Sequence, residues 1–178
     1  MCNADCIGAI DCGWQRESEN TLYVCDEGDG TLVTAARIVN GQPNVADDLA
    51  LATAGLQKWS LGTDGKWRML YVLQNGLNLG VSYGIANYPA ALNPATGGCR
   101  NLTGRVNGDG TVDLYAITST ISANGDQGAD PNKLVAVKDL LSATSLPGGN
   151  GGGLGTFTTL RAAQAGEVLR GISFAPGH

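Results

Sequence analysis

Three carboxylates close together have the clearest chemical potential in this sequence: Asp26, Glu27 and Asp29 directly follow the run Thr21-Leu-Tyr-Val-Cys25. A strand that ends in a loop would bring them to one loop mouth, and carboxylate oxygens are the ligands that calcium prefers. The spacing therefore predicts a calcium site, with a solvated acidic turn as the alternative. Calcium is the one cofactor that the sequence brings into consideration.

A second set of candidate residues lies in two long predicted loops. Tyr83, Asn87 and Tyr88 could stack on a carbohydrate and form hydrogen bonds with it, although loop tyrosines also serve to pin a loop to the body. Asp126 and Asp130 are expected on the same face of the protein as the acidic cluster. Asp126 and Asp130, together with the acidic cluster, predict an acidic mouth for a cation, a sugar or a basic peptide, with scattered solubilising charge as the alternative.

Nucleophilic catalysis has little support. His178 is the single histidine, and the sequence contains neither a Gly-x-Ser-x-Gly elbow nor a Gly-x-x-x-x-Gly-Lys phosphate loop. We therefore predict no catalytic residue and a protein without enzyme activity of its own. Two alternatives remain open: a calcium-dependent hydrolase of the propeller lactonase type, which depends on fold analogy alone, and a carbohydrate-binding lectin.

The cysteines are concentrated near the start of the chain. The five candidates for disulfide bonds are Cys2, Cys6, Cys12, Cys25 and Cys99. Their spacing lacks the C-x-x-C pairs of zinc sites, so disulfides outside the cytoplasm are favoured over a metal site. An odd number leaves one thiol free or paired with another chain. The first residues do not resemble a secretion signal, so either a signal has been removed or the chain is part of a longer protein.

The elements that would position these residues are strands. Glycine is abundant, with 27 residues, and only 15% of residues are charged, which is typical of a turn-rich β protein. Period-two alternation predicts the strands of two similar units. They cover residues 21–25, 55–61 and 66–73 in the first unit, and residues 101–106, 112–118, 132–138 and 156–160 in the second. Residues 168–174 are predicted to begin a third unit, and residues 6–10 are a candidate for the missing strand of the first.

A four-strand unit that occurs about twice predicts an all-β, propeller-like fold with two antiparallel blades in a partial ring. Residues 1–20 would form a Cys-rich segment, and residues 21–178 the blades, with long loops on one face. Two blades cannot close a ring of the usual four to eight. Because open edges and faces need covering, we expect self-association or another blade-bearing chain, which the solution mass from light scattering would test.

Charge and hydropathy bear on two further kinds of partner, nucleic acids and membranes. Nucleic acid is not expected as a partner, because the net charge is −5 and the sequence lacks the clustered Lys and Arg that neutralise phosphates. The sequence contains no apolar run of the roughly 20 residues that a membrane span needs.

Several segments resemble the C-terminal part of large secreted bacterial β-propeller-like proteins of unassigned activity. These are residues 100–120, 125–134 and 157–174, and residues 22–28 with 56–59 are similar to the preceding blade. The likeness covers about residues 20–176. It implies the blade fold but little chemistry, and the Cys-rich start departs from the pattern. The overall prediction is a non-catalytic structural or binding module outside the cytoplasm that assembles through blade edges and faces.

Overall fold

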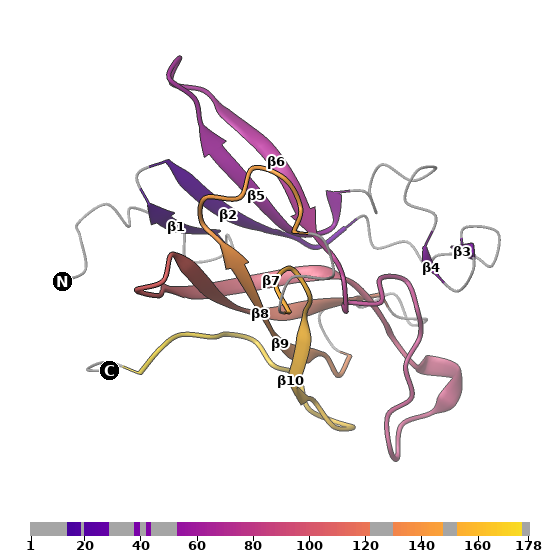
Figure 1. Ribbon diagram of the computed structural model, residues 1–178. Coiled ribbons are helices and arrows are strands. Elements are labelled where there is room, and N and C mark those ends of the chain that lie inside the picture. The colour runs from indigo at the N-terminus through magenta and orange to yellow at the C-terminus, as the bar shows by residue number, and fades with distance from the viewer. Residues whose placement is uncertain are drawn as a thin grey trace.

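The computed structural model describes residues 20–28, 53–121, 130–147 and 153–175, together with the backbone of three short strands. These strands are β1 (Trp14–Ser18), β3 (Ile38–Val39) and β4 (Gln42–Pro43), of which the last two pair with each other. The described residues form an all-β structure with one short 3-10 helix, η2 (Ala90–Leu92) (Figure 1). Among them, no helix has the length and apolar character needed to cross a membrane.

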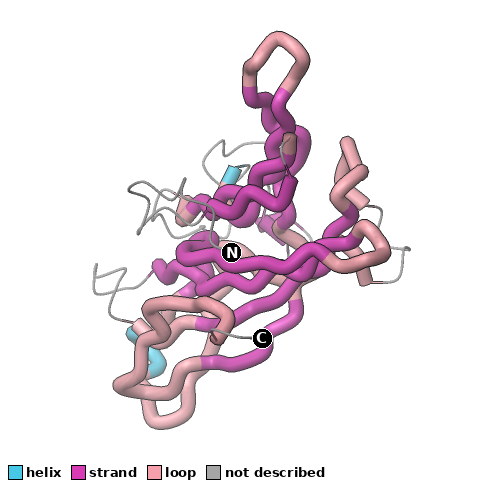
Figure 2. Tube along the Cα trace, turned by 90° about the vertical axis from the view of Figure 1, so that its left-hand side faces the viewer, coloured by secondary structure: helices cyan, strands magenta, loops and turns pink. Residues whose placement is uncertain are grey.

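The first sheet is an antiparallel meander in the order β1-β2-β5-β6. It confirms the three strands expected in the first unit, as β2 (Thr21–Asp26), β5 (Gly55–Leu61) and β6 (Trp67–Leu73). The fourth strand is β1, whereas the candidate for this place, residues 6–10, lies outside the described residues. A tight turn, closed by the Gly65 amide donating to the Gly62 carbonyl over 2.9 Å, joins β5 to β6. This hairpin projects clear of the other strands (Figure 2).

The second sheet is also a meander, in the order β7-β8-β9-β10, and confirms the four strands expected in the second unit. Its strands are β7 (Ala95–Val106), β8 (Thr111–Ile121), β9 (Lys133–Leu140) and β10 (Thr158–Ala162). β7 begins at Ala95, earlier than the predicted residue 101. Its first half contains Gly97 and Gly98, which weaken a strand signal in the sequence. A Cβ on Gly98 would lie 2.0 Å from the Asp26 carbonyl oxygen, so glycine allows β7 to approach the first sheet.

The prediction of a third unit at residues 168–174 is wrong, because these residues do not form a strand. They run as an extended segment along the second sheet, on the face turned away from the first sheet. The Asn132 side chain takes the place of a strand neighbour: its Oδ1 accepts from the Leu169 amide at 2.8 Å, and its Nδ2 donates to the Leu169 carbonyl at 2.9 Å. Further along, the Phe174 ring contacts the edge of Tyr115, with centroids 5.7 Å apart.

The core lies between the two sheets, which pack face to face (Figure 1). Leu56 and Leu73 of the first sheet and Leu114 of the second are all fully buried in one apolar cluster. A disulfide between Cys25 on β2 and Cys99 on β7 links the sheets across this core. It confirms two of the five disulfide candidates, while Cys2, Cys6 and Cys12 lie outside the described residues.

Candidate functional site

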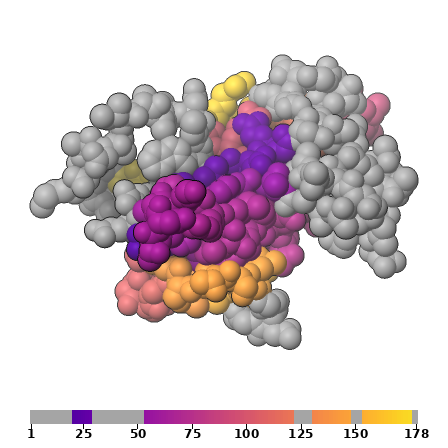
Figure 3. All heavy atoms as spheres, turned by 90° about the horizontal axis from the view of Figure 1, so that it is seen from above, coloured from indigo at the N-terminus to yellow at the C-terminus, as the bar shows by residue number. Residues whose placement is uncertain are grey.

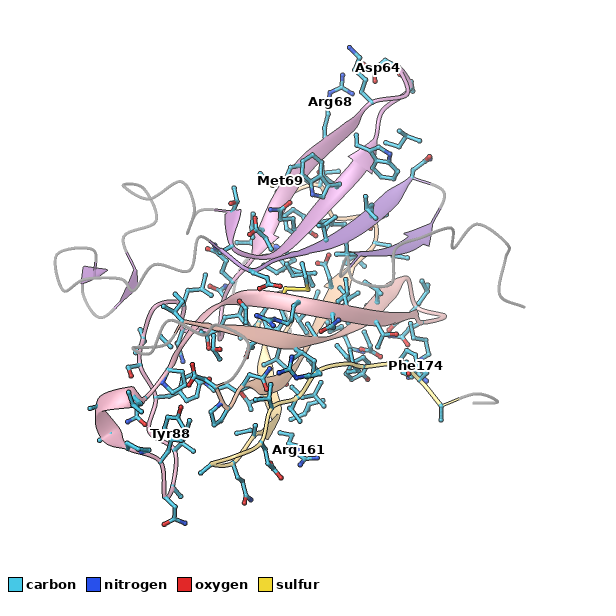
Figure 4. All side chains as sticks on the ribbon, turned by 180° about the vertical axis from the view of Figure 1, so that it is seen from behind. Asp64, Arg68, Met69, Tyr88, Arg161 and Phe174 are labelled. Atoms are coloured by element: carbon cyan, nitrogen blue, oxygen red, sulfur yellow. A yellow bond between two sulfur atoms is a disulfide. The ribbon has the colours of Figure 1, made fainter. Side chains whose placement is uncertain are left out.

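A pocket of about 530 Å³ opens between the loop that follows β6 and the turn that follows β10. Its volume falls within the range of about 300–1,000 Å³ that is typical of small-molecule sites. Small apolar side chains dominate its lining, and Lys133 is its charged residue. The lining residues are Tyr83, Gly84, Ile85, Ala86, Asn87, Lys133, Ala162, Ala163, Gln164 and Ala165. The loop lies at the end of the molecule opposite the tip of the β5-β6 hairpin, as the labels Tyr88 and Asp64 show in Figure 4.

The loop on one side of this pocket is fixed to the second sheet by its own backbone. The Gly80 amide donates to the Thr96 carbonyl at 2.8 Å, and the Tyr83 amide donates to the Pro94 carbonyl at 3.0 Å. Leu77 and Leu79 are each 3% exposed and anchor the start of the loop in the core. Polar backbone groups and apolar anchors thus hold the loop in one arrangement, which gives the pocket a preformed wall.

Tyr83 is held from two sides. Its hydroxyl donates to the Pro131 carbonyl at 2.8 Å, and the Lys133 Nζ atom lies 3.6 Å from the centroid of its ring. This is a cation–π contact, and it occupies one face of the ring that the sequence analysis assigned to carbohydrate stacking. Burial raises the pKa of Tyr83 and lowers the pKa of Lys133, since each charged form loses hydration.

Tyr88 and Asp130, two of the candidate ligand-binding residues, lie next to each other. The Tyr88 hydroxyl donates to Asp130 Oδ1 at 2.5 Å, and this hydrogen bond raises the pKa of Tyr88. Asp130 is 1% exposed, and its Oδ2 has no hydrogen-bond partner among the described residues. Neither side chain lines the pocket, whereas Tyr83 and Asn87 do. Asp126 lies outside the described residues.

Sequence reasoning missed Lys133 and the turn at residues 162–165. Lys133 begins a strand in an ordinary alternating pattern, and its contact with Tyr83 joins residues far apart in the chain. The alanines of the turn carry no chemical signal by themselves. Only the pairing of β9 with β10, in which Lys133 lies opposite Ala162, brings the two segments to the same end of the sheet.

The acidic cluster is engaged with protein donors. Asp26 Oδ1 accepts from the Gly28 amide at 2.9 Å, and Oδ2 accepts from Gln57 Nε2 at 2.8 Å. Glu27 pairs with Arg100 at 2.9 Å, while Asp29 lies outside the described residues. Over the described part of the chain, no group of three His, Cys, Asp or Glu side chains is arranged to hold a metal ion. The calcium site at Asp26, Glu27 and Asp29 therefore remains a prediction.

A smaller pocket of about 360 Å³ lies next to this cluster, lined by Glu27, Arg100, Asn101 and Arg170. The charge of Arg100 is already balanced there by Glu27. This balance leaves the pocket at Tyr83 as the stronger candidate site for a ligand.

A buried polar network between the two sheets is the other feature that the sequence analysis missed. Lys58 and Asp139 are fully buried, and Lys58 Nζ lies 3.2 Å from Asp139 Oδ2. The Tyr23 and Tyr71 hydroxyls donate to Asp139 Oδ2 at 2.6 and 2.7 Å. Desolvation lowers the pKa of Lys58, and desolvation together with Asp139 raises the pKa of Tyr71. With no exposed atoms on either charged side chain, the network serves the fold rather than a ligand.

Lys58 also reaches the segment that follows β9. Its Nζ donates to the carbonyls of Leu140 and Ala143 at 2.7 and 3.0 Å. Seen from above, the magenta atoms of the first sheet lie against the orange atoms of this region (Figure 3). The signal in the sequence was a charged residue on the inward side of a strand, two residues after the buried Leu56.

Comparison with known proteins identified no matching family model, curated protein or solved structure. The resemblance to secreted β-propeller-like proteins is therefore still a prediction.

Proposed function

We propose that this chain is a non-catalytic binding module that works outside the cytoplasm and holds a small ligand in the pocket beside Tyr83. The observation that supports this proposal is the preformed cavity of about 530 Å³ with an apolar lining and a few polar groups. Small-molecule sites combine these two properties. The polar residues of the lining that could bind a ligand are Lys133, Asn87 and Gln164.

The lining favours binding over catalysis. A nucleophile needs a hydrogen-bonded base next to it, and the described lining residues offer no such pair. The Tyr83 hydroxyl is occupied as a donor to the Pro131 carbonyl. A lectin is the second candidate function, supported by the two amides, which can bind sugar hydroxyls.

The location and the assembly belong to the same proposal. A disulfide between the sheets is compatible with an oxidising compartment. Two stacked four-stranded meanders suit neighbouring blades of a propeller-like partial ring, which further blades would complete. Trp67 and Met69, which are 37% and 42% exposed on the face of the first sheet turned away from the second, support assembly through that face.

The pocket is tested by recording amide chemical shifts while small sugars and small organic acids are added. We expect binding to shift the amides of residues 83–87 and 162–165. Ala86→Trp should fill the pocket and abolish these shifts. Ala91→Trp is the matched control, because Ala91 is exposed in the same loop but does not line the pocket. Shifts confined to other regions, or binding that survives Ala86→Trp, would contradict the proposal.

A further inference from the structure

The charge of the pocket indicates what kind of ligand it takes. We infer that it binds a small carboxylate, with Lys133 as the residue that recognises the carboxylate group. This inference rests on the proposed binding function and adds the chemical class of the ligand.

Lys133 lacks a carboxylate partner among the ion pairs of the described residues. Its amine lies 3.6 Å from the centroid of the Tyr83 ring, and the residue as a whole is half-buried. Most other cations of the described residues have a carboxylate within ion-pair distance. These pairs are Lys58 with Asp139, Arg68 with Asp64, Arg100 with Glu27, Lys138 with Asp113 and Arg161 with Glu167. A partly buried cation without a counter-charge is costly, and a bound anion would offset that cost.

Two acids lie close in sequence to residues of the lining, Asp130 before Lys133 and Glu167 after Ala165. Asp130 accepts the Tyr88 hydroxyl, and Glu167 accepts the Gln164 amide at 3.0 Å and pairs with Arg161. Neither of these two acids lines the pocket. A carboxylate in the cavity would thus meet the Lys133 amine directly, as a charge-assisted hydrogen-bond acceptor.

The rest of the lining fixes the size and character of the ligand. Ile85 and the alanines at positions 86, 162, 163 and 165 offer an apolar surface, and the Asn87 and Gln164 amides lie among them. The apolar part suits the chain of an aliphatic acid, and the amides suit the hydroxyls of a sugar acid. Both sources share the carboxylate, which is the group that Lys133 would select. A cationic ligand would be repelled by Lys133, and a neutral one would leave its charge unbalanced.

The inference is tested by measuring affinity for two matched pairs: hexanoate against hexanol, and galacturonate against galactose. We expect the acid of at least one pair to bind at least tenfold more tightly than its neutral partner. Lys133→Met should remove this preference, and Lys133→Arg should retain it. Lys138→Met is the matched control, since Lys138 is an exposed lysine on the same strand. The ratio between hexanoate and galacturonate then tells an aliphatic acid from a sugar acid.

The outcomes separate the two levels of the proposal. If acids and their neutral partners shift the amides of residues 83–87 and 162–165 and bind with equal affinity, the inference is overturned and the binding function still stands. A preference for acids that persists in a folded Lys133→Met protein would also overturn it. If none of the four compounds shifts the amides of the pocket, both the binding function and the inference fail.

Discussion

At the scale of single residues, the most consequential contact is the one between Lys58 and Asp139. Taking both charges out of water is expensive, and their attraction offsets this cost only if the remaining donors and acceptors are satisfied. Here, two tyrosine hydroxyls donate hydrogen bonds to Asp139. Lys58 donates to two backbone carbonyls and to the Tyr71 hydroxyl. The network also fixes how the two sheets lie against each other, because its members come from both.

Breaking this pair should be strongly destabilising. We expect Asp139→Asn and Lys58→Met each to lower the free energy of unfolding by about 3–5 kcal/mol, because each leaves one buried charge without its partner. The double variant, Lys58→Met with Asp139→Leu, should lose less than the sum of the two, since it removes both charges. Urea unfolding, followed by tryptophan fluorescence, measures these differences.

The exposed pair of Asp64 and Arg68 on the β5-β6 hairpin provides the control (Figure 4). These side chains are 45% and 58% exposed, and solvent screens such a pair. Arg68→Met should therefore leave the stability unchanged within error. A Lys58→Met protein as stable as Arg68→Met would show that the buried pair contributes nothing to the fold.

At the scale of elements, three neighbouring strands of the second sheet carry a row of charges on the face turned away from the first sheet. Asp113 on β8 lies 3.2 Å from Lys138 on β9 and 3.8 Å from Arg105 on β7. Asn107 Nδ2 also donates to the Asp113 carboxylate at 3.0 Å. Partial burial raises the pKa of Asp113, but these partners outweigh it and hold the pKa below its usual 3.8.

This arrangement predicts how stability changes in acid. The folded pKa of Asp113 is lowered, so its stabilisation is present above the unfolded pKa of 3.8 and is lost as the pH falls through the folded pKa. Between about pH 5 and pH 2, the free energy of unfolding should therefore fall less steeply for Asp113→Asn than for the natural protein. Urea unfolding at several pH values gives both slopes, and identical slopes would refute the prediction. Lys138→Met should reduce the slope in part, because it removes the closest cation.

Much of the strand order could be predicted from the sequence, because alternating residues in β2, β5, β8 and β9 mark strands with distinct faces. The early start of β7 could not, since Gly97 and Gly98 are explained only by contact with the other sheet. The segment at residues 168–174 has an apolar strand-like pattern, yet the backbone amide and carbonyl of its Leu169 bond to the Asn132 side chain instead of to a strand. This bonding joins residues far apart in the chain, so the pattern of neighbouring residues in the sequence does not predict it.

The candidate site was predictable to a similar extent. Tyr83 and Asn87 were singled out as polar groups of a long loop, and both line the pocket. Lys133 and the turn at residues 162–165 reach the pocket through strand pairing, so their role depends on the sheet rather than on their own sequence neighbourhood.

At the scale of the whole molecule, apolar, polar and covalent interactions hold the two meanders together. They share an apolar core, the network at Lys58 and Asp139, and the disulfide between Cys25 and Cys99. The disulfide connects residues 74 positions apart, one in each sheet. A cross-link of this span restricts the unfolded chain strongly, so it should matter more to stability than its small contact area suggests.

Removing the disulfide with Cys25→Ala and Cys99→Ala should lower the free energy of unfolding by about 4.5 kcal/mol, the chain-entropy contribution for a loop of this length. Urea unfolding of both proteins, with and without reductant, measures the difference. Reductant should lower the free energy of unfolding of the natural protein toward that of the double variant. It should leave the free energy of unfolding of the double variant unchanged, because that variant has no disulfide between the sheets. If the double variant matched the oxidised natural protein, the core and the buried network alone would hold the sheets together, and the disulfide would contribute nothing measurable to their association.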